Sequence, residues 1–150
     1  MIEQFQVVAD AVRLEVAPKD RKKIGICGAG GIVEGAHLPA YVKAGLEVVA
    51  IFDVDHEKAK QVAAKFGIAR IYATIEELLA DEDVEIVDIA VPAAAQPEIF
   101  AKAAAAKKHI LAQKPFATTV AAGELMVKQA ADKYLADKKM TRRAPADCQS

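Results

Sequence analysis

The chain has 150 residues, of which 53% are hydrophobic and 27% are charged, and its formal net charge is −1. This length and composition are typical of one globular domain with a substantial core. The small net charge excludes a strong electrostatic attraction to nucleic acid or to an anionic membrane. No apolar run approaches the ~20 residues that span a bilayer, so we expect neither nucleic acid nor membrane as a partner.

The two ends of the chain differ from its centre. Residues 1–22 form a leader with several acids and no continuous apolar stretch, which argues against a secretory signal. Residues 135–150 form a polar, basic tail without a strand pattern. The two cysteines, Cys27 and Cys148, suggest neither a disulfide framework nor a metal site. We therefore expect a cytoplasmic protein without a bound metal, with Cys27 as a small core residue.

Residues 23–134 alternate between strand and helix patterns. Short apolar runs predict strands at 24–28, 48–52, 71–72, 85–91 and 109–112. Helices are predicted at 30–44, 56–66, 75–79, 96–107 and 118–134, and Thr74 and Glu77 predict a capping box on the third of them. This alternation indicates an α/β fold, a doubly wound parallel sheet of five strands with an incomplete sixth.

The first predicted strand runs into a glycine cluster, Gly28, Gly30 and Gly31, and then into a helix. Glycines let the backbone approach a pyrophosphate, and a helix N-terminus offers free N–H groups and a positive dipole end. The second strand ends in Asp53. Its distance along the chain from Gly28 is close to the ~20 residues expected for an acid that binds the adenosine ribose. These parts predict a dinucleotide site, although Val33 occupies the third small position of the G-x-G-x-x-G pattern.

The C-terminal ends of parallel strands share one edge of the sheet, where ligands bind. Residues predicted to bind the cofactor at this edge are Gly28, Gly30, Gly31, Ile32, Asp53, Val91, Pro92, Gln96, Gln113, Lys114 and Pro115. No lysine or arginine immediately follows Asp53 to receive a 2′-phosphate, so NAD is favoured over NADP.

Five segments within residues 22–134 read G-I-C-G-A-G-G-I-V, H-L-P-A-Y, A-I-F-D-V-D, V-D-I-A-V-P and Q-K-P-F-A. Together they resemble the N-terminal domain of the Gfo/Idh/MocA oxidoreductases, a family that includes glucose–fructose oxidoreductase and inositol 2-dehydrogenase. The resemblance implies an NAD(P)-binding Rossmann fold. It also implies hydride transfer between a nicotinamide cofactor and a sugar, polyol or related hydroxy substrate.

The most specific part of the resemblance is the lysine–proline pair, Lys114 and Pro115. In the family this lysine lies near the nicotinamide and the substrate hydroxyl, which implies that Lys114 is a catalytic residue. Gln113 stands where the family has a glutamate, so a negative neighbour of the lysine is replaced by a neutral one. Gln96 stands where many members carry a histidine.

The resemblance further implies a second, C-terminal domain with most substrate contacts and with an aspartate and a histidine used in catalysis, and we find no such domain in this sequence. We therefore expect the chain to bind NAD but to turn over little or no substrate alone. Truncation, a frameshifted gene and a single-domain protein would all look like this. An uncovered sheet edge predicts marginal stability and self-association.

Several alternatives stay open. Lys114 can be a solvated surface lysine, and Asp53 can be a helix cap, although Asp55 suits that role better. Gln96 either lines the cofactor site or does not, and His37 is expected to be structural. The chain can also be a non-enzymatic nucleotide-binding module or an inactive remnant. A methyltransferase-like domain is disfavoured by the Q-K-P-F segment and by the lack of an acid just before the first glycine.

Overall fold

The structure is a computed structural model that describes residues 21–137, with side chains described for residues 21–132. Most of the predicted leader and the tail from residue 138 onward lie outside the described residues. Predictions about those two segments therefore stay predictions.

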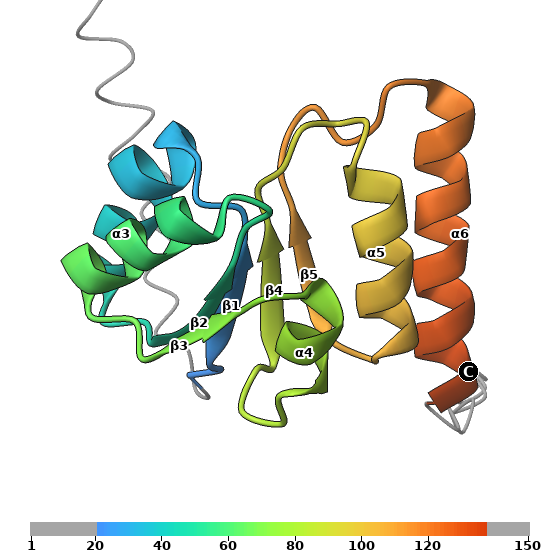
Figure 1. Ribbon diagram of the computed structural model, residues 1–150. Coiled ribbons are helices and arrows are strands. Elements are labelled where there is room, and N and C mark those ends of the chain that lie inside the picture. Colours follow the sequence, from blue (N-terminus) through green and yellow to red (C-terminus); the bar gives the residue numbers. More distant parts are fainter. Residues whose placement is uncertain (1–20, 138–150) are drawn as a thin grey trace, which may run out of the picture.

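Five parallel strands form one sheet in the order β3-β2-β1-β4-β5, as Figure 1 shows. The strands are β1 (Ile24–Cys27), β2 (Val48–Phe52), β3 (Arg70–Tyr72), β4 (Ile86–Ile89) and β5 (His109–Ala112). The predicted parallel α/β sheet is confirmed. The fourth strand is shorter than the predicted range 85–91, and the described residues contain no sixth strand.

Helices cover both faces of the sheet (Figure 1). One face is covered by α2 (Leu38–Ala44) and α3 (His56–Phe66), and the other by α4 (Ile75–Ala80), α5 (Gln96–Ala105) and α6 (Val120–Asp137). The α6 helix packs against α5. Two hydrophobic clusters result, one on each face, because alternate residues of a strand point to opposite sides.

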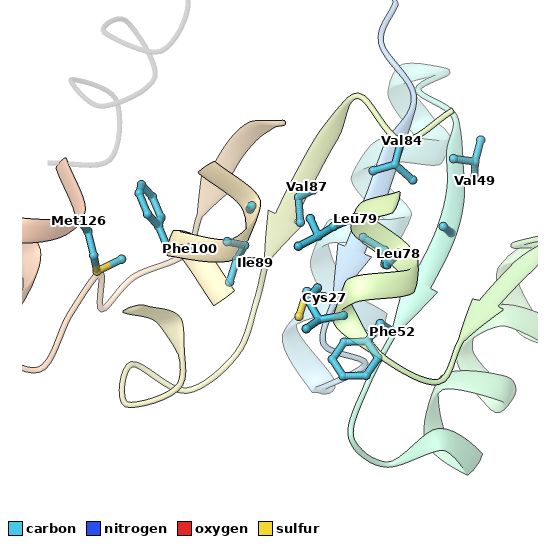
Figure 2. Close-up of a cluster of buried hydrophobic side chains, with 13 residues drawn as sticks. Cys27, Val49, Phe52, Leu78, Leu79, Val84, Val87, Ile89, Phe100 and Met126 are labelled. Carbon is cyan, nitrogen blue, oxygen red and sulfur yellow. The ribbon is translucent and has the colours of Figure 1, made fainter. Parts of the chain in front are cut away.

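The larger cluster lies between the sheet and the α4–α5–α6 layer. Figure 2 shows its buried side chains, which come from β1, β2, β4, the three helices and the loop before β4; those labelled are Cys27, Val49, Phe52, Leu78, Leu79, Val84, Val87, Ile89, Phe100 and Met126. The prediction that Cys27 is a core residue is confirmed, since its side chain is fully buried.

The helix ends follow the predicted capping signals. Thr74 and Glu77 form the predicted capping box at the start of α4. Asp55 caps α3 by accepting a hydrogen bond from the Lys58 amide at 3.1 Å. Thr119 caps α6, since its hydroxyl accepts from the Ala122 amide at 3.2 Å.

The first predicted helix, 30–44, is confirmed in extent, since residues 31–44 are helical throughout, but it is not one regular helix. A π-helical turn, η1 (Val33–His37), leads into α2. Pro39 stands in the first turn of α2. It lacks the N–H that a regular α-helix would use to bond the carbonyl of Gly35, so the regular pattern cannot continue through this segment.

We predict that the Cys27 thiol is unreactive in the folded chain. Its burial, together with the nearby Asp53 and Asp88 carboxylates, raises the pKa of the thiol to about 12, and only a thiolate attacks a disulfide reagent. In a Cys148→Ser variant, Ellman's reagent at mildly alkaline pH should find no fast-reacting thiol, and one per chain after unfolding in guanidinium. Fast labelling of the folded chain would contradict the buried position.

Candidate functional site

The C-terminal ends of four strands lie in register. Cys27 of β1 pairs with Phe52 of β2 on one side and with Ile89 of β4 on the other. Ile89 pairs in turn with Ala112 of β5. The four strands therefore end at one level, and the chain that leaves each of them emerges at the same edge of the sheet.

The predicted site segments are the segments that leave these strands. Gly28 and Asp53 directly follow β1 and β2, and Gln113 directly follows β5. The Gly28 amide donates to the Phe52 carbonyl at 2.7 Å, and the Gln113 amide donates to the Ile89 carbonyl at 3.1 Å. These bonds extend the strand pairing into the loops and bring the predicted segments together along one edge.

Gly28 is required by the backbone at this edge. Its φ is +110°, and a Cβ added there would lie 2.5 Å from the carbonyl oxygen of Ala90. Neither the conformation nor the distance admits another residue. The turn after β1 therefore passes directly against the segment that leaves β4.

Gly30 and Gly31 are different, because a Cβ added at either would meet no atom within 4 Å. The fold itself does not need glycine at these two positions. Both lie where the turn enters the helical segment, and the neighbouring Ile32 is 53% exposed. The missing side chains leave open space beside N–H groups that have no partner inside a helix, which is the arrangement that suits an anion.

Asp53 is held beside the glycine turn. One carboxylate oxygen accepts a hydrogen bond from the Ala29 amide at 2.6 Å, and the other accepts from the Asp55 amide at 2.8 Å. The helix cap of α3 is Asp55 and not Asp53. The carboxylate of Asp53 is thus fixed in orientation and remains partly exposed at the edge.

The loop after β5 carries an exposed cation. Lys114 and Pro115 are exposed, Gln113 is partly exposed, and the peptide bond between Lys114 and Pro115 is cis. The segment after β4 lies next to this loop, with Val91 partly exposed and Pro92 exposed. The predicted residues of both loops are therefore accessible to a ligand at this edge.

Gln96 has a different placement from the other predicted residues. It is the first residue of α5, and its side chain is 0% exposed. Its amide nitrogen donates to the carbonyl oxygens of Val91, Gln113 and Pro115. The sequence left open whether Gln96 lines the cofactor site. Its burial supports the alternative in which Gln96 does not line the site directly.

A buried polar cluster that the sequence analysis did not single out lies below the glycine turn. Asp88 of β4 is 0% exposed, and its Oδ2 accepts from the Tyr41 hydroxyl and from His37 Nδ1, each at 2.8 Å. Burial and the bond to Asp88 raise the pKa of the Tyr41 hydroxyl. His37 is thus structural, as expected, since it joins η1 to the sheet.

The sequence signal for this cluster was an acid inside the apolar run E-I-V-D-I-A-V. A buried carboxylate requires partners, and a histidine and a tyrosine four residues apart share one helical face. Only the fold places that face over β4. In the part of the chain that the structure describes, no three histidines, cysteines or acids gather to hold a metal, and no helix could cross a membrane.

The family model Gfo/Idh/MocA, described as an oxidoreductase family with an NAD-binding Rossmann fold, matches residues 22–136. The chain belongs to this family. The resemblance carried by the five sequence segments is thereby confirmed, and the matched range covers the whole sheet and all helices of the described structure except the last residue of α6.

Relatives of this family member include dehydrogenases and a reductase. Inositol 2-dehydrogenase of Acidothermus cellulolyticus is 40% identical over 109 residues, which are 72% of this chain and 32% of the relative. The structure of myo-inositol dehydrogenase from Lactobacillus casei, in complex with NAD(H) and myo-inositol, matches with a TM-score of 0.70 and 30% identity, covering 75% of this chain and 34% of that one.

A 3-ketoreductase from Actinomadura kijaniata, in complex with TDP-benzene and NADP, matches with a TM-score of 0.70 and 29% identity. The match covers 76% of this chain and 36% of that chain. The chain therefore spans about a third of the length of these relatives.

We predict that Gly28→Ala destabilises the domain by more than about 2 kcal/mol, because the added Cβ meets the Ala90 carbonyl in a left-handed backbone conformation. Gly31→Ala is the matched control, since its Cβ meets nothing and its φ is not in the left-handed region. Urea unfolding followed by circular dichroism measures both free energies of unfolding. Equal midpoints for the two variants would contradict the close approach.

Proposed function

We propose that these residues bind a dinucleotide along the C-terminal edge of the sheet, with NAD preferred to NADP, as the cofactor-binding part of an oxidoreductase. The observation that carries this proposal is the glycine turn. Gly28 brings the backbone against β4, while Gly30 and Gly31 leave open space at the start of a helical segment.

We retain a cytoplasmic location as a prediction from the cysteine content.

The pyrophosphate would bind over Gly30 and Gly31. At this place the chain offers backbone N–H groups, the positive end of a helix dipole and no side chain in the way. Ile32, which is exposed next to the turn, supplies an apolar contact beside the phosphates.

Asp53 would bind the adenosine ribose. A carboxylate offers about four lone-pair sites, and backbone amides occupy one site on each oxygen of Asp53. Capacity therefore remains for both ribose hydroxyls. A 2′-phosphate would instead lie against this carboxylate, which repels it. The next residues in the chain, Val54 and Asp55, supply no cation to offset the repulsion, so the site favours NAD.

The nicotinamide half would extend toward the loops after β4 and β5, because the adenosine half is held on the β2 side of the turn. Its contacts there would be Val91, Pro92, Gln113, Lys114 and Pro115. Lys114 is the candidate catalytic residue, since its exposed ammonium lies at this edge. When bound, the cofactor supplies an acceptor or donor for hydride.

An alcohol oxidised here would give up a hydride from carbon, which the cofactor would accept, and a proton from its hydroxyl. Lys114 Nζ would take up that proton, and in the direction of reduction it would return one. For a whole protein of the relatives' length, we propose a sugar or polyol as substrate, because relatives are named for inositol and one was solved with myo-inositol. For these 150 residues alone we expect cofactor binding with little or no turnover.

Calorimetric titration of the chain with NAD, NADH and NADP tests the proposal. We expect saturable NAD binding, NADP binding that is at least ~10-fold weaker, and no binding to Gly30→Asp. The aspartate would place a negative charge in the space proposed for the pyrophosphate, and its Cβ would meet no atom of the described residues within 4 Å. A folded wild-type chain that binds none of the three would rule the proposal out.

Asp53→Ala should weaken NAD binding by roughly 1–3 kcal/mol, the range for hydrogen bonds to a charged group. Asp55→Ala is its matched control, because it removes the cap of α3 at a cost of about 1 kcal/mol in stability and leaves the ribose contacts in place. Titration with NAD measures both variants. An unchanged affinity in Asp53→Ala would remove this residue from the site.

The predicted self-association has support in the edge strand β5, where Leu111 is 45% exposed. Edge strands with exposed apolar side chains pair readily with other chains. Sedimentation velocity of the 150-residue chain should show a weight-average sedimentation coefficient that rises with concentration, and Leu111→Lys should reduce this rise. A constant coefficient for the wild type would contradict the prediction.

A further inference from the structure

The side chain of Gln96 joins two loops of the proposed site from below. Its Nε2 lies 2.9 Å from the carbonyl oxygen of Gln113, 2.9 Å from that of Pro115 and 3.3 Å from that of Val91. Val91 belongs to the segment after β4, and the other two belong to the loop after β5. One amide group therefore connects two segments that diverge beyond the paired strands.

The orientation of this amide is determined by its surroundings. Three carbonyl oxygens face one end of the amide, and only the NH₂ end can donate to them. The other end, Oε1, is buried and has no hydrogen-bond partner among residues 21–137. An unsatisfied buried acceptor is costly, so the structure keeps the nitrogen on the three carbonyls at the expense of the oxygen.

Lys114 lies between two of the accepting carbonyls. Gln113 and Pro115 flank it on either side, so its backbone is held at both neighbours while its side chain stays exposed. Phe116 adds a second attachment, since its ring packs edge-on against Phe100 at a centroid distance of 5.7 Å and an interplanar angle of 86°. Because Phe100 is one helical turn after Gln96, both attachments come from the same side of α5.

We propose that Gln96 is a positioning residue: it fixes the backbone around Lys114 and joins the loops after β4 and β5 into one surface for the nicotinamide half of the dinucleotide. This role rests on the proposed function, and it assigns Gln96 no contact with cofactor or substrate. Lys114 is presented by a loop whose direction Gln96 sets.

The proposal predicts different effects of a Gln96 substitution on the binding of the two halves of the dinucleotide. Gln96 donates to the loops after β4 and β5, whereas the glycine turn and Asp53 are held by other bonds. Loss of the Gln96 amide should therefore weaken binding of the nicotinamide half and leave the adenosine half unaffected. ADP-ribose lacks only the nicotinamide ring and keeps both riboses and the pyrophosphate, so comparing its affinity with that of NAD isolates the contacts of the nicotinamide ring.

The test compares the affinities of wild type and Gln96→Met for NAD and for ADP-ribose by calorimetry. Methionine has a similar length and volume but no donor, so NAD affinity should fall roughly 3–10-fold, while ADP-ribose affinity stays within about 2-fold. Gln96→His, whose ring N–H reaches a similar distance from the backbone, should restore part of the NAD affinity. Leu78→Ala, a fully buried site on α4, is the control for general destabilisation and should leave the ratio of the two affinities unchanged.

A Gln96→Met variant with the wild-type ratio of affinities would overturn the positioning role and leave the proposed function standing. A folded wild-type chain that binds neither ligand would overturn both. If the Gln96→Met variant does not fold, ¹⁵N relaxation of the wild-type chain tests the positioning role instead. Amides of Gln113, Lys114 and Phe116 as rigid as those of β4, with order parameters of about 0.85, support the role, and values below about 0.6 overturn it.

Discussion

The close approach of the Gly28 backbone to the Ala90 carbonyl is the contact on which the rest of the site depends. It allows the chain leaving β1 to pass directly over the end of β4, and any side chain at Gly28 would push the two apart. The ends of four strands lie level beside this contact, and the loops that follow them leave at the same edge.

Two buried polar side chains then fix what surrounds the turn. Asp88 bonds His37 and Tyr41 and so joins the π-helical turn and α2 to β4, while Gln96 joins the loops after β4 and β5. Each has one buried oxygen without a hydrogen-bond partner in the described part of the chain. Apolar packing alone would hold these elements against the sheet without setting their direction, whereas hydrogen bonds are directional. The free-energy cost of burying these two polar side chains is thus offset by bonds that fix the direction of the segments at this edge.

The residues that match the Gfo/Idh/MocA family model include those that form this edge of the sheet. The matched residues contain the glycine turn, the acid after β2 and the lysine after β5, which are the groups proposed for pyrophosphate, ribose and proton transfer. As proposed, these groups would recognise the parts of a dinucleotide and act next to its nicotinamide. None of them would distinguish one sugar or polyol from another.

The sequence by itself determined the parallel α/β fold, the glycine turn, Asp53 at the end of β2 and the caps of Thr74 and Asp55. These features are local, since apolar period, conformational freedom and capping depend on residues within a few positions. Only the tertiary structure decided that the first helix contains a π-helical turn, that Asp88 meets His37 and Tyr41, and that the buried Gln96 bonds the loops after β4 and β5. These outcomes depend on bonds between residues far apart in the chain. The fold alone sets those distances, and no local pattern encodes them.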